Sequence, residues 1–250
     1  MDKTQEVGTA TGASATRSAF RLSDSIKVWL GLVVFLVLVK LGLTAFYPNA
    51  FADPSQAAVF GWVPLALFSL FGLVGVGLSE RTGFPSAWRK GISYLRWIVL
   101  PLVIGAGMAT LAVIHDTLTH FTRIVDASHG VTQQYTGFVP MLLVFTGGAV
   151  LVEVLYRLFT IPLLLGLISN LLLKGRWQTP IFWILAVILS AWEPLSQDVG
   201  RLTGLDLVLQ FGLAYALNLT QAAFFRKYGF LAAILVRVGY YLVWHAIYIH

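Results

Sequence analysis

Long apolar runs alternate with short polar segments over most of the chain. Runs of about 17–25 apolar residues have the length of a helix that crosses a bilayer. The runs lie at 28–47, 57–78, 94–114, 137–173, 180–192, 205–225 and 229–249. The pattern therefore predicts an all-α fold, a polytopic integral membrane bundle of seven to eight transmembrane helices.

The fourth run, 137–173, leaves the number of spans open. As a single helix it would be about 55 Å long, which exceeds a hydrocarbon core of roughly 30 Å. Pro162 offers a place to break it. If 158–173 crosses back, the chain has eight spans. If this segment lies oblique or re-enters, the chain has seven.

Two further observations favour different numbers of spans. Glu153 lies about 16 residues after its run begins and Glu193 about 13 after its own, so they share a depth only if both helices enter from the same side. That arrangement requires eight spans. Four basic residues favour seven by the positive-inside rule, namely Lys174, Arg176, Arg226 and Lys227.

Composition supports a membrane protein. The chain is 58% hydrophobic and 11% charged, whereas soluble domains carry roughly 25% charged residues. So little charge cannot coat a water-facing surface, which excludes a soluble enzyme, a disordered chain and a nucleic-acid binder built on a basic surface. The absence of cysteine excludes disulfides, thiolate metal sites and thiol catalysis.

The net charge of +6 reflects orientation in the membrane. Basic residues gather before the first run and between the second and third: Lys3, Arg17, Arg21, Lys27, Arg81, Arg89, Lys90 and Arg96. The positive-inside rule then places the N-terminus in the cytoplasm. We predict a flexible cytoplasmic tail over 1–27 and a membrane domain over 28–250. Tryptophans near the ends of the runs are expected at the interfaces: Trp29, Trp62, Trp97, Trp177, Trp183 and Trp244.

Five charged residues lie inside apolar runs, where an unpaired charge costs several kcal/mol. Lys40 has no obvious partner in the sequence, and it either faces an internal cavity or snorkels to the interface. Glu153 and Arg157 are four residues apart, in the order that favours an intrahelical pair. Glu193 and Arg237 are single opposite charges on different helices, and we expect them to face each other.

The segment 147–168, GGAVLVEVLYRLFTIPLLLGLI, resembles the first motif of the CAAX-protease and bacteriocin-processing (CPBP) family of intramembrane glutamic proteases. That motif has two adjacent glutamates followed by an aromatic-Arg ending. Here Tyr156 and Arg157 match the ending, Glu153 matches the second glutamate, and Val152 stands where the first belongs.

Two later segments are similar to the other motifs of this family. In 182–195, Leu189 occupies the place of a phenylalanine and Glu193 that of a histidine. The C-terminal motif has an asparagine, a basic-Gly turn and Ala-Ala-x-x-x-His-x-x-x-Asn/Asp. Asn218 and the turn at 226–229 match it, whereas Arg237 replaces the histidine and Tyr241 the Asn or Asp. The resemblance covers 147–250.

The resemblance implies a protease fold with changed chemistry. The family is thought to activate water with its first glutamate, assisted by the two histidines and the Asn or Asp. Those positions hold Val152, Glu193, Arg237 and Tyr241. A valine cannot exchange a proton, and a guanidinium cannot bind metal. We therefore expect a structural ion-pair site, packed by Tyr241 and Trp192, in a catalytically degraded homologue.

Three function classes follow from these residues. The first is a binding, scaffold or regulatory subunit in the bacterial inner membrane, without protease activity. The second is an active intramembrane endopeptidase with an unorthodox site, in which Glu153, Glu193 and His245 could serve, although His245 also suits an interface. The third is a transport or respiratory-complex subunit. No cofactor, metal or nucleic acid is expected, and the expected partners are the lipid bilayer and other membrane subunits.

Overall fold

The computed structural model describes residues 10–51, 54–87, 93–120, 122, 137–196 and 204–248, the side chains of 10–23 and 54–56 excepted. Lys3, Arg89 and Lys90, which contribute to the predicted orientation, lie outside the described residues. So do the side chains of Arg17 and Arg21.

The described residues form helices and contain no strand. Four of the segments, labelled η, are π-helical turns. In chain order the elements are α1 (Ala10–Phe46), α2 (Pro54–Val59), α3 (Trp62–Arg81), η1 (Leu95–Val99), α4 (Leu100–Thr119), α6 (Phe138–Glu153), η2 (Val154–Phe159), α7 (Thr160–Leu165), η3 (Gly166–Leu172), α8 (Gln178–Ser196), α9 (Gly204–Tyr228), α10 (Phe230–Tyr241) and η5 (Leu242–Tyr248).

Seven helical segments of the described chain are long and apolar enough to cross a membrane. They are Asp24–Phe46, Trp62–Arg81, Leu95–Thr119, Phe138–Leu172, Gln178–Ser196, Gly204–Tyr228 and Phe230–Tyr248. The predicted all-α polytopic bundle is confirmed. The first span begins within α1, which extends back to Ala10, so much of the stretch predicted as a tail over 1–27 is helical. Its cytoplasmic location stays a prediction.

The long apolar run forms the fourth span as one continuous helical stretch. Phe138–Leu172 is one helical stretch of 35 residues in which α6, η2, α7 and η3 follow one another without a reversal. Pro162 lies in α7, and the π-helical turns before and after it accommodate the hydrogen bond that proline cannot make. The predicted crossing back at 158–173, and with it the eight-span alternative, is wrong for this part of the chain.

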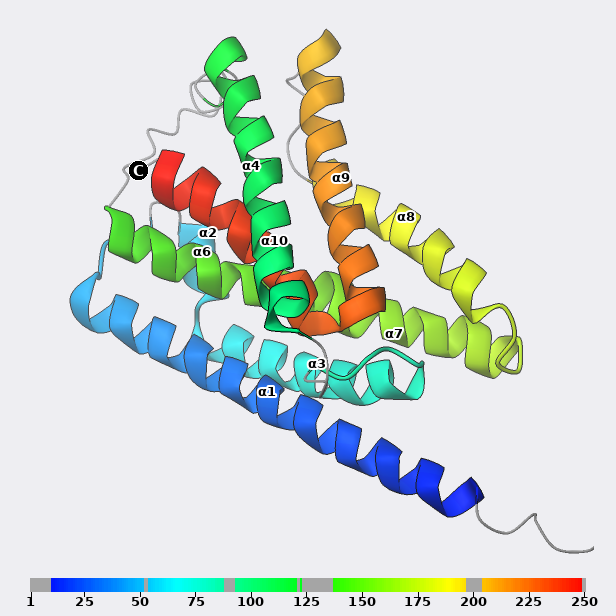
Figure 1. The fold of residues 1–250 in the computed structure, drawn as a ribbon. Helices are drawn as coiled ribbons and strands as arrows, with labels where there is room; N and C mark the ends of the chain where they lie inside the picture. Colours follow the sequence, from blue (N-terminus) through cyan, green and yellow to red (C-terminus); the bar gives the residue numbers. More distant parts are fainter. Residues whose placement is uncertain are drawn as a thin grey trace, which may run out of the picture.

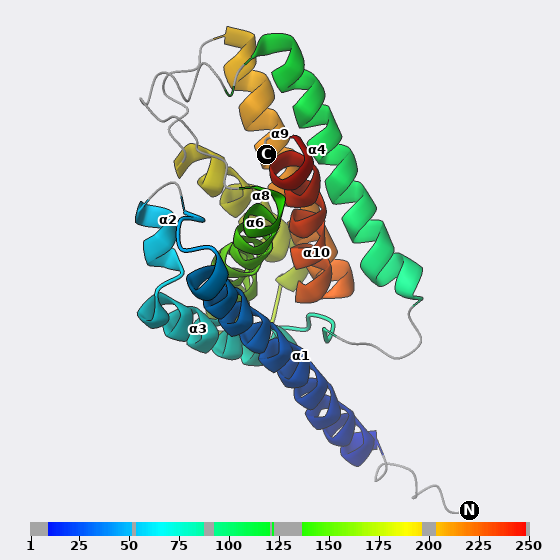
Figure 2. The same ribbon diagram turned by 90° about the vertical axis from the view of Figure 1, so that its left-hand side faces the viewer.

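The α6–η3 segment lies at the centre of the fold. α1 and α3 run beside it, and α4 and α9 cross it steeply (Figure 1). Viewed almost along its axis, α6 is surrounded by α1, α3, α8, α9 and α10 (Figure 2). Half of its most apolar window is buried, the largest share among the seven spans. Charges on this helix therefore lie inside protein.

The tightest packing joins α4 and α10. Gly105 of α4 lies against the backbone carbonyl of Val236, and Gly239 of α10 lies against the carbonyl of Leu102. A side chain at either glycine would collide with the opposite backbone. Small residues of this kind allow membrane helices to approach closely.

Two tryptophans that were predicted at the membrane interface are buried instead. Trp29 and Trp97 are 1% and 2% exposed, so they belong to the core and not to an interfacial belt. The Trp29 indole N–H donates to the Ser69 carbonyl and that of Trp97 to the Tyr228 carbonyl, at 3.1 and 2.9 Å. A satisfied donor lets a tryptophan be buried whole. Trp62, Trp177 and Trp183 are exposed, as lipid-facing or interfacial residues would be.

Candidate functional site

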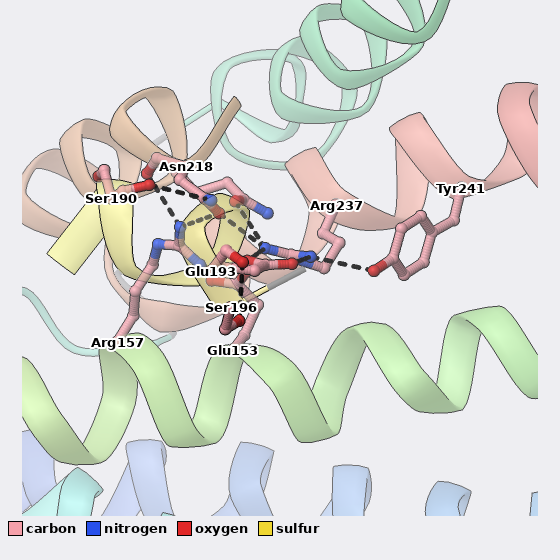
Figure 3. A network of polar contacts seen from close by, with 9 residues as sticks. Glu153, Arg157, Ser190, Glu193, Ser196, Asn218, Arg237 and Tyr241 are labelled. Atoms are coloured by element: carbon pink, nitrogen blue, oxygen red, sulfur yellow. Dashed lines mark hydrogen bonds and ion pairs between the residues drawn. The ribbon is translucent and has the colours of Figure 1, made fainter. Parts of the chain in front are cut away.

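Seven polar side chains meet where α6, α8, α9 and α10 converge (Figure 3). We call this cluster the ion-pair network. α6 and η2 supply two of its members, α8 one, α9 two and α10 two. The members are Glu153, Arg157, Glu193, Asn218, Gln221, Arg237 and Tyr241.

Arg237 and Glu193 form the ion pair that the sequence predicts. Nη1 of Arg237 donates to Oε1 of Glu193 at 2.7 Å, and Nη2 donates to Oε2 at 2.6 Å. The pairing is bidentate, the geometry in which a guanidinium binds a carboxylate most strongly. α8 and α10 are thereby tied together across 44 residues of sequence.

Glu153 binds both arginines through one oxygen. Its Oε1 accepts from Nη1 of Arg157 at 2.6 Å and from Nε of Arg237 at 2.8 Å. The predicted Glu153–Arg157 pair is therefore present, and Arg237 also joins it to Glu193. Glu153 ends α6 and Arg157 lies in η2, so the pair spans the junction of the two segments on one helix face.

The meeting of Glu153 and Glu193 at one arginine corrects the depth argument. Glu153 lies nineteen residues before Leu172, and Glu193 lies fifteen after Gln178. Counted from the turn that joins η3 to α8, the two depths are similar. An antiparallel pair of helices thus brings the acids together without an extra crossing, because the fourth span is 35 residues long.

Asn218 and Gln221 complete the network from α9. Oδ1 of Asn218 accepts from Nη2 of both Arg157 and Arg237, at 2.6 and 2.8 Å. Oε1 of Gln221 accepts from Nη2 of Arg237 at 3.2 Å. Sequence reasoning noted Asn218 only as a family match and missed Gln221. Their spacing of three within the apolar stretch LNLTQAAF was the available signal, since it places both on one helix face.

Tyr241 takes its predicted place, whereas Trp192 does not. The Tyr241 hydroxyl accepts from Nη1 of Arg237 at 3.0 Å. Trp192 is 62% exposed, so the prediction that it packs around the ion pair is wrong. It precedes Glu193 on α8, and adjacent residues on a helix point about 100° apart. Val152, next to Glu153, is partly exposed and brings no polar atom to the network.

The network is buried and balanced in charge. Glu153, Arg157 and Arg237 are 2%, 4% and 2% exposed, whereas the Glu193 side chain keeps 16% of its surface accessible. Two guanidinium groups face two carboxylates, so the cluster is neutral as a whole. Neutralisation and multiple hydrogen bonds are the conditions under which charges are tolerated in a membrane interior.

Two polar atoms of the network have no partner among the described residues. They are Oε2 of Glu153 and Nε2 of Gln221, and both are buried. One acceptor and one donor of the cluster therefore make no hydrogen bond within the described part of the chain, which is uncommon for buried polar atoms. One oxygen of Glu153 therefore keeps its hydrogen-bonding capacity, although the other is held by two cations.

A pocket opens beside the network. Its volume is about 230 Å³, and its walls come from α8, α9, α10 and η5. Glu193, Asn218 and Arg237 form its inner end, and the remaining lining is largely aromatic and polar: Gln210, Tyr240, Tyr241, Trp244 and His245. The arrangement can bind a group that offers both apolar surface and hydrogen bonds.

His245 lies in the wall of this pocket. Its ring stacks on Phe145 of α6, with centroids 3.4 Å apart and planes 5° apart, and meets Tyr241 edge-on. This placement differs from an exposed interfacial histidine. Among the described residues, no three His, Asp or Glu side chains are grouped as a metal site would require.

No family model, curated protein or solved structure matches this chain.

Proposed function

We propose that this chain is a CPBP-like membrane protein without protease activity, which acts as a binding or scaffold subunit of a membrane assembly. We place it in the bacterial inner membrane with the N-terminus in the cytoplasm. The resemblance of 147–250 to the three family motifs supports the family, and the basic residues at 3–27 and 81–96 support the orientation.

The observation that carries the proposal is the position of Arg237. Its guanidinium binds both oxygens of Glu193 and one oxygen of Glu153. A carboxylate that activates water must be free to accept a proton, whereas guanidinium groups occupy both oxygens of Glu193 and one oxygen of Glu153. Arg237 thus suits a fixed junction between helices. The aromatic pocket beside it is the surface that we assign to a partner segment.

The experiment is site-specific photo-crosslinking in native membranes, followed by purification in mild detergent. A photoreactive residue replaces Trp244, which lines the pocket, or Trp183, which is exposed on α8 outside it. We expect one protein partner to be crosslinked at position 244 and not at 183. Identical adducts at both positions, or recovery of a lone monomer with the probe at position 244, would overturn the assignment of the pocket.

A second candidate is an active endopeptidase, and the unpartnered Oε2 of Glu153 is the observation that favours it. A water bound there would lie next to two cations that could hold a developing oxyanion. The test is cleavage of a peptide library by the purified chain, with Glu153→Gln as the comparison. Cleavage that disappears in Glu153→Gln would establish this candidate and reject the first.

The transport alternative has less support. It needs a continuous polar path lined by Lys40 or the acids. The pocket at Glu193 and the pocket at Lys40 share no lining residue. We therefore do not carry this alternative further.

A further inference from the structure

Lys40 is the one charge of the five singled out in the sequence that stands apart from the ion-pair network. It lies on α1, six residues before the helix ends at Phe46. In the described part of the chain, its ammonium group has no hydrogen bond or ion pair. An unpaired charge inside an apolar span is costly, so a partner from outside the chain would stabilise it.

Lys40 lines a pocket of about 230 Å³ near the end of α1. The walls are mostly apolar, with Leu43 and Phe51 among them, and two hydroxyl groups interrupt them. The Thr44 hydroxyl donates to the Lys40 carbonyl at 2.8 Å and is therefore already used. The Tyr47 hydroxyl is the second donor, beside the ammonium group, that the pocket offers to a ligand.

The depth of Lys40 fits the headgroup layer. Six residues of helix separate it from Phe46, or about 9 Å, and a lysine side chain covers much of that distance. Phe46 is 77% exposed at the end of the span, and Tyr47 follows it. Aromatic residues at a span end mark the membrane–water interface. A ligand in this pocket would have its charge at the interface and its apolar part along the walls.

The charges of the pocket define the class of lipid. One ammonium group matches the single negative charge of a phosphodiester. Aspartate and glutamate are absent from the lining residues of the pocket, so none of these side chains would pair with the amine of a zwitterionic headgroup. Basic groups that face the lipid headgroups in this way are attracted to anionic lipid.

We propose that this pocket is a binding site for an anionic phospholipid without a headgroup amine, of the phosphatidylglycerol class. Lys40 Nζ and the Tyr47 hydroxyl donate to the phosphate oxygens, and an acyl chain packs on Leu43 and Phe51. The site shares no residue with the pocket beside Arg237, and it does not rest on the function proposed above.

The test is native mass spectrometry of the full chain released from nanodiscs that contain equal amounts of phosphatidylglycerol and phosphatidylcholine. The variants are Lys40→Met, which keeps the apolar stem, and Tyr47→Phe, which removes one oxygen. The control is Lys27→Met, because Lys27 is exposed on the same helix and pairs with Asp24 at 3.4 Å. We expect Lys40→Met to lower phosphatidylglycerol retention by about tenfold or more, as the loss of a charge-assisted hydrogen bond implies.

Tyr47→Phe should lower retention by a smaller factor, and Lys27→Met should leave it unchanged. Because Tyr47→Phe removes a single oxygen atom, it reports on the site even if Lys40→Met does not fold. Equal retention of both lipids by the natural chain, or full retention by Lys40→Met, would overturn the proposal. So would release of the lipid by inorganic phosphate, which would indicate a site for a soluble anion.

Discussion

Arg237 of α10 holds both carboxylate oxygens of Glu193 on α8, at 2.7 and 2.6 Å, while its Nε reaches Glu153 of α6 at 2.8 Å. A single guanidinium therefore joins three membrane helices. Under the proposed relationship to the CPBP family, Arg237 and Glu193 would each stand where that family has a histidine, and a salt bridge would take the place of two titratable rings.

The first prediction concerns this salt bridge. Glu193→Ala and Arg237→Ala should each lower the free energy of unfolding by about 3–5 kcal/mol, because each leaves an opposite charge buried without its partner. The double variant should cost less than the sum of the two, since it leaves Glu153 paired with Arg157. Denaturant unfolding in detergent micelles measures all three.

Arg81→Ala is the matched control for this double-mutant cycle, because Arg81 is an exposed arginine at the end of α3. It should change stability by less than about 0.5 kcal/mol. Strict additivity of Glu193→Ala and Arg237→Ala would mean that the two side chains do not stabilise each other in the membrane.

The second prediction separates charge from shape at Asn218. Asn218→Leu should be strongly destabilising, because it removes an oxygen that accepts from both Arg157 and Arg237, each such bond contributing about 1.5–3 kcal/mol. Asn218→Asp keeps that oxygen and adds a negative charge between two cations. It should therefore be more stable than Asn218→Leu, even though it loses the donor that binds the Ser190 carbonyl.

Thermal unfolding of the two purified variants compares them directly. If Asn218→Asp were as unstable as Asn218→Leu, the amide donor to Ser190 would matter more than the acceptor between the arginines. The network would then depend on the contact between α8 and α9 and not on its charges.

The ion pairs were the part of the site that the sequence could predict. Glu193 and Arg237 lie far apart in the chain, yet each would be an isolated charge in an apolar helix, and this cost is enough to pair them. The contribution of Gln221 was missed because a single glutamine can be satisfied in many ways. Its partner is fixed only when α9 packs against α10, which no local pattern encodes.

The path of the fourth span was the part of the fold that the sequence left undecided. A run of 35 helical residues exceeds the bilayer thickness, and Pro162 made a break reasonable. The outcome depends on packing, because the charges on this helix are buried in a network with α8, α9 and α10. Trp29 and Trp97 illustrate the same limit: their burial follows from the carbonyl groups of Ser69 and Tyr228, which lie far away in sequence.

The third prediction concerns the contact between α4 and α10. Gly105→Ala and Gly239→Ala should each destabilise the fold by about 1–3 kcal/mol, because the new methyl group meets an opposing carbonyl of the other helix. Gly107→Ala is the matched control, because Gly107 lies on α4 like Gly105 and nothing lies within 4 Å of the carbon that the substitution adds. It should be neutral or stabilising, because alanine favours a helix.

The unfolding midpoints of the three glycine variants measure how much the close contact between α4 and α10 stabilises the fold. Equal midpoints for Gly105→Ala and Gly107→Ala would show that α4 and α10 can separate without loss. The close approach of the two backbones would then not contribute to stability.

The last prediction concerns topology. Seven spans place the two chain ends on opposite sides of the membrane, and the N-terminus is predicted in the cytoplasm. The turn after η3, which carries Lys174 and Arg176, and the end of α9, which carries Arg226 and Lys227, then face the cytoplasm too. This distribution follows the positive-inside rule throughout. In Figure 1, the end of α3 and the turn after η3 both lie on the right of the view, and the start of α1 lies below them on the same side.

Fusions of alkaline phosphatase, which is active only outside the cytoplasm, and of green fluorescent protein, which is fluorescent only inside it, test this arrangement. A C-terminal fusion should give phosphatase activity and no fluorescence, and a fusion after Arg176 should give the reverse. Replacing Lys174 and Arg176 together by glutamate should weaken this orientation, whereas glutamate at Arg123, in a segment predicted to lie outside, should not. A fluorescent C-terminal fusion would require an even number of spans and would contradict the seven-helix arrangement.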